Sequence, residues 1–255
     1  MMMKVRDLLN YIDTFAPFAL AEEWDNSGLM VGSFDAEVGR VAICLDAVPE
    51  AVIKASEDHC EVLLCHHPLI FRALKKINID TETGRTICEA LTRGVNIIAA
   101  HTNWDKADEG VNATLSELLG LVETKPLGDF GVIGKLDEAV ETEKFLDRVK
   151  TSWGLSRLDF YSEAVSRKIS RVALCGGAGA EFWSAAKLHN ADMYITADMK
   201  YHELIDATHA GLAIALCEHG EMERASLSKL AEKISACGVE ATLLNVKALV
   251  QPMRL

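Results

Sequence analysis

The pattern of apolar and polar residues along the chain predicts an α/β protein. Short apolar runs typical of buried strands alternate with segments whose apolar residues recur every three or four positions, as in amphipathic helices. The predicted strands are 29–31, 41–45, 62–65, 95–100, 158–161, 171–175, 212–217 and 241–246. The predicted helices are 5–18, 49–58, 83–93, 112–119, 141–152, 201–210 and 222–236. Such alternation favours parallel or mixed sheets flanked by helices.

Part of this pattern occurs twice. The segment Arg171-Val-Ala-Leu-Cys175 repeats Arg40-Val-Ala-Ile-Cys44, because residue 171 follows residue 40 by 131 positions. The same offset aligns Glu50 with Glu181, Ala55 with Ala186, and Cys65-His66-His67 with Thr196-Ala197-Asp198. A strand, a helix and a strand in matched order predict two similar α/β lobes that arose by internal duplication.

A turn-rich segment marks the expected boundary between the lobes. Residues 126–134 begin with a proline and contain three glycines, a composition typical of turns. We expect a first lobe of 1–125 plus about 215–255 and a second lobe of about 126–214. The functional site is expected in the cleft between them.

Three predicted strands end in residues that can bind metal. His66 and His67 close the first of these strands, His101 and Asp105 follow the second, and His219 and Glu223 follow the third. The carboxyl ends of parallel strands form the ligand crevice of open α/β sheets, so these side chains can converge. His66 and His67 are adjacent and can share one site only if the chain bends, which Pro68 favours.

The residue types indicate the metal chemistry. Imidazoles and carboxylates without thiolates suit Zn, Mn or Fe and disfavour a closed structural zinc. The groups outnumber the three protein ligands of a single catalytic zinc, which favours a dinuclear site with a net positive charge that attracts an anionic substrate. A lone histidine is more often an ordinary surface or core residue, and we interpret His59, His189, His202 and His209 in that way.

Three further motifs have competing interpretations. Residues 176–179 (Gly-Gly-Ala-Gly) follow a strand and could hold phosphate, but they lack the P-loop lysine, so a tight turn is favoured. Residues 24–27 (Trp-Asp-Asn-Ser) predict a polar turn or a supporting element of the site. Cys44, Cys65 and Cys175 lie in apolar runs and are predicted to be core residues.

Composition narrows the possible partners. The formal net charge of -12 over 255 residues disfavours general binding to nucleic acid or anionic membranes. Seven cysteines without a C-x-x-C pair indicate reduced thiols. Neither a signal segment nor a membrane-spanning run is evident. We therefore expect a soluble, cytoplasmic protein.

Four motifs together resemble the NIF-three-like family, which is commonly labelled GTP cyclohydrolase 1 type 2. They are Trp24-Asp25-Asn26-Ser27-Gly28-Leu29, Cys65-His66-His67-Pro68-Leu69-Ile70-Phe71, His101-Thr102-Asn103-Trp104-Asp105 and His219-x-x-x-Glu223. The resemblance spans nearly the whole chain. One departure is Gly220, where many members carry an aromatic residue, and the chain resembles the short form of the family because no long insertion separates the two repeat copies.

The resemblance implies a two-lobed α/β fold, a dinuclear centre and a ring-shaped homohexamer. By this correspondence the metal ligands are His66, His67, Asp105, His219 and Glu223, and His101 is the candidate catalytic residue. The implied cofactors are two divalent ions per subunit, Zn, Mn or Fe.

The functional hypothesis that follows is a metal-dependent hydrolase. A metal-bridging water would attack a purine-ring carbon or a phosphorus atom of a nucleotide or phosphoester, with His101 carrying the proton. The alternative is a non-enzymatic metal-binding or regulatory scaffold protein.

Overall fold

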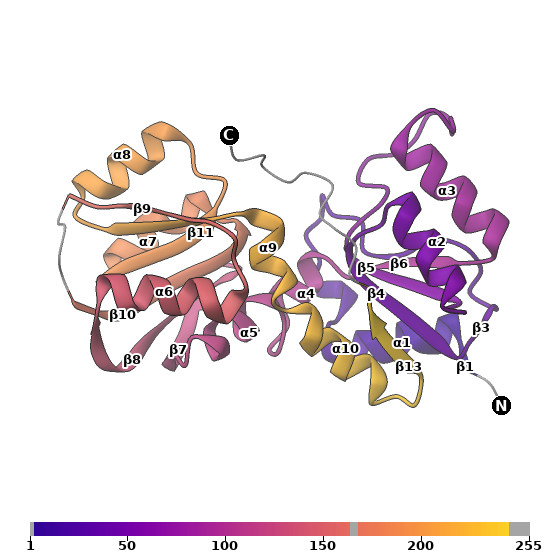
Figure 1. Ribbon diagram of the computed structural model, residues 1–255, viewed down its shortest axis with the longest axis horizontal. Helices are drawn as coiled ribbons and strands as arrows, with labels where there is room; N and C mark the ends of the chain where they lie inside the picture. Colours follow the sequence, from indigo (N-terminus) through magenta and orange to yellow (C-terminus); the bar gives the residue numbers. More distant parts are fainter. Residues whose placement is uncertain (1–2, 164–167, 245–255) are drawn as a thin grey trace. The chain divides into compact units, whose positions relative to one another are not determined.

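Two large mixed β-sheets, each flanked by helices, organise the computed structural model, which describes residues 3–163 and 168–244 (Figure 1). Each sheet belongs to a separate compact unit. Unit 1 comprises Met1–Asp108 with Leu227–Leu255, and unit 2 comprises Glu109–Ser226. The predicted α/β class is confirmed.

The sheet of unit 1 has the strand order β13-β4-β5-β6-β2. Its parallel strands are β4 (Arg40–Asp46), β5 (Val62–His67), β6 (Asn96–Ala99) and β13 (Glu240–Leu243). Strand β2 (Gly28–Val31) pairs antiparallel with β6, and β1 (Met3–Lys4) pairs separately with β3 (Glu37–Val38).

Both faces of this sheet are buried, which explains why its strands are almost continuously apolar. Helices α2 (Pro49–Glu57) and α3 (Glu82–Arg93) lie along one face, and α1 (Val5–Phe15) and α10 (Leu227–Ser235) lie along the other (Figure 1). Pro49 opens α2 at a position where a helix needs no N–H donor. Short helices η1 (Phe18–Leu20) and α4 (Thr102–Lys106) complete the unit.

The sheet of unit 2 has the strand order β7-β8-β10-β11-β12-β9. Strands β10 (Lys168–Ala178), β11 (Met193–Ala197) and β12 (Ala213–Cys217) run parallel. Strands β7 (Val122–Leu127), β8 (Gly131–Glu141) and β9 (Leu158–Tyr161) add antiparallel edges. The helices are α5 (Val111–Leu118), α6 (Thr142–Trp153), η2 (Ala180–Phe182), α7 (Trp183–Leu188), α8 (Tyr201–His209) and α9 (His219–Arg224).

The sequence repeat is matched by repeated structure. Val41 pairs with Val62 in unit 1, and Val172 pairs with Met193 in unit 2, the same register displaced by 131 positions. The turn before the second strand repeats as well, because His59 and Asn190 both have a φ of 58°.

In each copy of the repeat, a carboxylate accepts hydrogen bonds from two neighbouring backbone N–H groups of the first strand or the residue before it. Glu61 accepts hydrogen bonds from the Gly39 and Arg40 backbone at 3.0 and 2.9 Å. Asp192 accepts from the Ser170 and Arg171 backbone at 2.9 and 2.8 Å. The two carboxylates are related by the same offset of 131 positions. Each immediately precedes the second strand of its copy and accepts from backbone N–H groups at or next to the first strand.

Three details differ from the predictions. The segment 126–134 is not a boundary but joins the antiparallel pair β7 and β8, because its glycines occupy a short turn and strand positions between apolar residues. The helix predicted over 222–236 is two helices, α9 and α10. The predicted strand 241–246 ends at Leu243 in β13, and its last two residues lie outside the described part of the chain.

The chain passes from unit 1 to unit 2 between Asp108 and Glu109 and returns to unit 1 between Ser226 and Leu227. The sequence analysis placed these two boundaries near residues 125 and 215. Strand β12 and helix α9 thus lie in unit 2. For β12 the reason is its pairing with β11.

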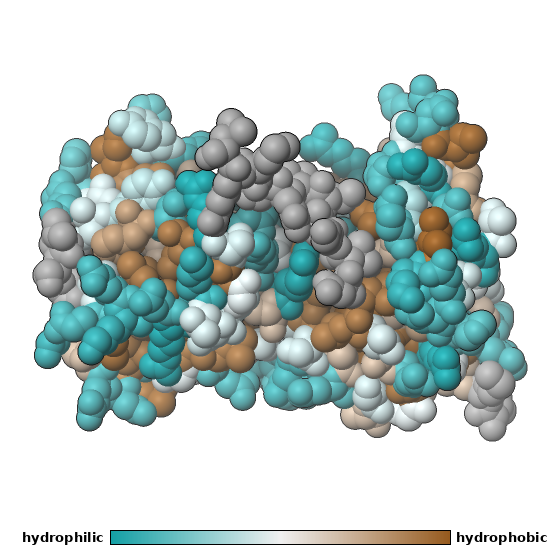
Figure 2. Space-filling model, viewed as in Figure 1, coloured by the Kyte–Doolittle hydropathy of each residue, from teal (hydrophilic) through white to brown (hydrophobic). Residues whose placement is uncertain are grey.

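Polar residues cover much of the surface seen in Figure 2, with apolar patches between them. None of the described helices combines the length and the apolar character needed to cross a bilayer. All seven cysteines lie in the described part and none forms a disulfide. Cys44, Cys65 and Cys175 are buried, as predicted, and burial raises the pKa of the Cys65 thiol to about 12.

The carboxylate of Asp192 provides a test of these hydrogen bonds to the first strand. Asp192→Ala removes the acceptor of two backbone N–H groups, so we expect the free energy of unfolding to fall by about 1–3 kcal/mol. Asp192→Asn keeps an oxygen acceptor and should cost less. Chemical denaturation of the three proteins measures the difference, and equal midpoints for the alanine variant and the parent would contradict this role.

Candidate metal centre

His66 and His67 lie together at the end of β5. Their ring centroids are 5.1 Å apart, although adjacent strand residues normally point to opposite faces. His66 is fully buried, and its Nδ1 donates to the Ala100 carbonyl oxygen at 2.9 Å. His67 lies opposite Asp46 in the sheet register, and its Nδ1 is 2.7 Å from the Asp46 Oδ1. The two rings therefore lie close enough together for both to serve one site.

His101 and Asp105 join the same cluster from the next strand end. His101 immediately precedes α4, and its ring centroid lies 5.3 Å from that of His66 and 5.8 Å from that of His67. One nitrogen from each of the three histidines falls within 4.8 Å of the others, which is a spacing that can hold a metal ion. Asp105 Oδ1 lies 3.5 Å from His66 Nε2, and both atoms are buried.

A buried carboxylate holds His101. The Asp25 side chain is fully buried, and its Oδ1 accepts from His101 Nδ1 at 2.7 Å. Its Oδ2 accepts from the Thr102 hydroxyl at 2.6 Å and from the Thr102 backbone at 3.1 Å. Burial alone would raise the pKa of Asp25, but the hydrogen bonds from His101 and Thr102 and the charge of His101 hold that pKa well below its usual value. Asp25 is therefore an ionised acceptor.

His219 and Glu223 form a second cluster, within unit 2. Both lie on α9, and His219 Nε2 is 3.2 Å from Glu223 Oε2, as their spacing of four predicts. His219 Nδ1 is 2.6 Å from the Asp198 carboxylate. Burial alone would lower the pKa of His219, but hydrogen bonds and charges from Glu223 and Asp198 raise it to about 9.

The glycine-rich segment makes room for this second cluster. A Cβ on Gly177, whose φ is 66°, would lie 2.3 Å from the Glu223 Oε1 and 3.3 Å from the His219 ring. The Gly176 N–H donates to the Asn112 side chain and the Gly179 N–H donates to the Thr196 hydroxyl. Two of the donors that a phosphate cradle would use are thus engaged. The predicted tight turn is instead the irregular end of β10, because residues 176–178 belong to that strand and its register with β11 shifts there.

The four histidines of the two clusters share one hydrogen-bonding arrangement. Each Nδ1 lies against an oxygen that accepts hydrogen bonds: the Ala100 carbonyl or the carboxylates of Asp46, Asp25 and Asp198. An Nδ1–H that donates to such an oxygen fixes the ring and leaves Nε2 as the atom for a metal or a proton. This outer hydrogen bond is the usual companion of a metal-binding histidine.

The whole-chain comparisons agree with the motifs. The chain matches the family Duf34/NIF3 (NGG1p interacting factor 3) over residues 3–252. It belongs to this NIF3 family. A GTP cyclohydrolase 1 type 2 homolog of Clostridium perfringens is 35% identical over 240 residues, 91% of each chain. The GTP cyclohydrolase 1 type 2 of Helicobacter pylori (strain J99) is 30% identical over 248 residues, 96% of this chain and 98% of its own.

A solved structure shows a similar fold. The hypothetical protein SA1388 of Staphylococcus aureus superposes with a TM-score of 0.91 and 25% identity, covering 99% of this chain and 100% of its own. The Bacillus cereus protein related to NIF3 superposes with a TM-score of 0.90 and 23% identity, covering 100% of each chain. The chain thus shares its α/β fold with both structures.

The sequence identified the histidines better than it identified their supports. The four motifs contain every histidine of the two clusters, and Asp25 lies in the segment 24–27, which was interpreted as a polar turn or a supporting element of the site. Asp46 and Asp198 were not predicted to take part. Each is a carboxylate at a strand end, Asp46 closing β4 and Asp198 following β11, and that position is the signal that could have found them.

The ionised Asp25 side chain should make the stability of the protein depend on pH. Its pKa is lowered in the folded protein, so its contribution is fully present above the unfolded pKa, near 4, and is lost as the pH falls below that value. We expect Asp25→Asn to lower the free energy of unfolding by about 1–3 kcal/mol at neutral pH. Denaturation from about pH 3 to 8 should show this difference shrinking below about pH 4.

Asp35 is the matched control, because its carboxylate is 64% exposed and only ion-pairs with Lys4 and Arg6. Asp35→Asn should change stability little at any pH. A difference for Asp25→Asn that does not vary with pH would contradict the ionised state assigned to Asp25.

Proposed function

We propose that this NIF3 protein is a metal-dependent hydrolase. The ligands are His66, His67 and Asp105 of unit 1 together with His219 and Glu223 of unit 2, holding two divalent ions. The single observation that carries the proposal is the outer hydrogen bond on the Nδ1 of every histidine in the two clusters. The assignment of all five ligands to one centre rests on the sequence resemblance.

The donor set fits divalent zinc, manganese or iron. It offers imidazole nitrogens and carboxylate oxygens, and the buried thiols of the chain lie outside both groups. When bound, two such ions supply an activated water and polarise the group under attack. His219 would have to lose the proton that Glu223 and Asp198 favour on it before its Nε2 could bind a metal.

His101 has the contacts of a proton carrier. Its Nδ1–H is held by the ionised Asp25, so its Nε2 can take a proton and the carboxylate stabilises the cation that results. Asp25 positions this ring through contacts on both of its oxygens, which also fasten the start of α4.

The substrate we propose is a nucleotide or another phosphoester. The H. pylori relative carries the name GTP cyclohydrolase 1 type 2, which favours a purine nucleotide. Two exposed aromatic rings support a planar substrate: Trp24 is 57% exposed and Phe71 is 44% exposed, and each ring lies 6.3 Å from that of His101. They offer an aromatic surface in a chain that has Gly220 after its last histidine.

A non-enzymatic scaffold is the second candidate. The family description, NGG1p interacting factor 3, names an interaction rather than a reaction. In that case the metal centre would stabilise an assembly, and no substrate would turn over.

Three finer features belong to the same proposal. The repeated registers and carboxylates support an internal duplication as the origin of the two units. The family resemblance supports a ring-shaped homohexamer, which mass photometry of the purified protein can test. The seven cysteines without disulfides support a cytoplasmic location.

Removal of one ligand tests the mechanism. In protein loaded with Mn, Zn or Fe, His67→Ala should lower bound metal and reduce turnover at least about a hundredfold. Elemental analysis and assays on GTP, other nucleotides and phosphoesters measure the two effects. His202→Ala is the control, because His202 is exposed on α8 outside both clusters. Unchanged metal and turnover in His67→Ala would refute the mechanism, whereas full metal without turnover in the parent would favour the scaffold.

Replacement of Trp24 tests the aromatic surface. If a nucleobase stacks there, Trp24→Ala should raise KM about tenfold with little change in kcat or metal content. Trp24→Phe should retain most of the affinity because it keeps an aromatic face. Equal KM values for the parent and Trp24→Ala would show that Trp24 does not contact the substrate.

A further inference from the structure

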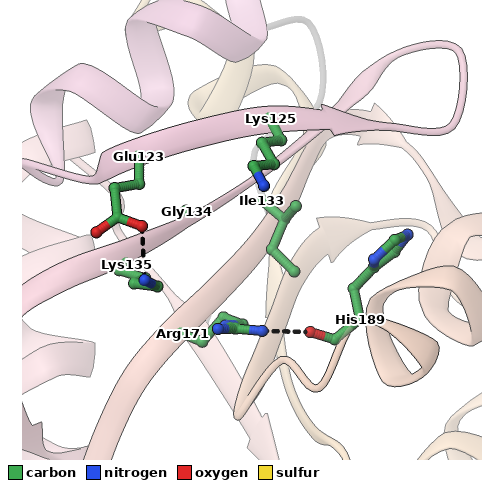
Figure 3. Close-up of a pocket in the computed structure, with 7 residues that line it drawn as sticks. All are labelled: Glu123, Lys125, Ile133, Gly134, Lys135, Arg171 and His189. Carbon is green, nitrogen blue, oxygen red and sulfur yellow. Dashed lines mark hydrogen bonds and ion pairs between the residues drawn. The ribbon is translucent and has the colours of Figure 1, made fainter.

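A small pocket on the sheet of unit 2 gathers three cationic side chains (Figure 3). Its volume is about 170 Å³. The lining residues come from β7, β8 and β10 and from the turn after α7: Glu123, Lys125, Ile133, Gly134, Lys135, Arg171 and His189. The chain carries a net charge of -12, so a concentration of positive charge is unusual for it.

The strand register brings these cations onto one face. Lys135 of β8 lies directly opposite Arg171 of β10, and Lys125 of β7 lies opposite Ile133. Ile133 and Lys135 are two residues apart and therefore point to the same side. Like charges directly opposite each other destabilise a pair of strands, so this arrangement calls for a compensating anion.

In unit 1, a carboxylate of the chain itself occupies the corresponding position. Arg40 is the residue in unit 1 that matches Arg171, and it lies opposite Glu240 of β13, with its Nε 3.0 Å from the Glu240 Oε2. Both arginines also donate to the main chain, Arg40 to Asp58 O at 3.4 Å and Arg171 to His189 O at 2.9 Å. The matching position thus holds a carboxylate in unit 1 and an ammonium group, Lys135, in unit 2.

The carboxylates near the pocket compensate only in part. Glu123 Oε2 lies 2.5 Å from Lys135 Nζ, but the Glu123 side chain is 64% exposed. The hydrogen bond from Lys135, together with the charges of Lys135, Lys125 and Arg171, lowers the pKa of Glu123. Asp192 accepts from the backbone N–H groups of Ser170 and Arg171, as Glu61 does in unit 1. The lining residues thus include three cationic side chains and one carboxylate, which leaves an excess of positive charge.

We propose that this pocket binds a multiply charged oxyanion of the phosphate class. A planar guanidinium beside two ammonium groups matches the oxygens of a phosphate group, and charge-assisted hydrogen bonds of this kind are strong. The pocket is separate from His219 and Glu223, since Arg171 and Gly177 lie six positions apart on β10, up to roughly 20 Å. The inference does not depend on the hydrolase proposal.

Titration of the full-chain, metal-loaded protein with pyrophosphate or inorganic phosphate, at constant ionic strength, tests the pocket. We expect saturable binding by calorimetry. Lys135→Glu places a carboxylate opposite Arg171, as Glu240 lies opposite Arg40 in unit 1, and should weaken binding about tenfold or more. Circular dichroism checks its folding, because the change also removes the ion pair with Glu123. Lys144→Glu makes the same charge change at an exposed position on α6 and should alter the affinity less than about twofold.

Two further variants complete the test. Glu123→Gln removes the carboxylate that competes for Lys135 and should tighten binding, a gain that misfolding cannot produce. His67→Ala should retain binding, because it changes only the proposed metal centre. Absence of saturable binding in the parent, equal affinities in the two charge-reversal variants, or complete loss in His67→Ala would overturn the proposal.

Discussion

The hydrogen bond from an imidazole Nδ1 to a fixed oxygen is the constraint on which the candidate chemistry depends. A histidine at a strand end can rotate, and its two nitrogens are equivalent choices for a metal until one is engaged. Here the oxygens come from the Ala100 carbonyl and from three aspartates, Asp46, Asp25 and Asp198. The sheet register places Asp46 opposite His67, so backbone pairing determines which nitrogen faces the site.

The repeated strand–helix–strand unit carries different side chains at its ends in the two units. Its interior is common to both, since the register and the carboxylates Glu61 and Asp192 recur at a constant offset. Its ends differ. At the carboxyl end of the second strand, His67 corresponds to Asp198, so a candidate ligand in one unit corresponds to the support of a candidate ligand in the other. At the opposite end, Glu240 faces Arg40 whereas Lys135 faces Arg171.

Both proposed anion sites depend on local positive charge in a chain whose net charge is -12. The overall charge repels anions, and long-range steering is screened within about 8–10 Å at physiological salt. Local arrangements therefore decide binding: bound divalent ions at the proposed centre, and the cations of the pocket between β7, β8 and β10. Family membership supports the metal chemistry more closely than it supports a substrate, because ligand residues can be matched one by one while the reaction depends on how the substrate is held.

The sequence alone determined the α/β class, most of the helices and strands, the repeat and the histidines of both clusters. It could do so because burial of an apolar strand or helix face imposes a period that local sequence records. It misjudged 126–134, where glycines within β8 resemble a turn, and it did not identify Asp46 and Asp198 as supports. Only the tertiary structure decided these contacts. A carboxylate at a strand end acquires its partner from a strand many residues away, and the register of the sheet, rather than any local pattern, selects that partner.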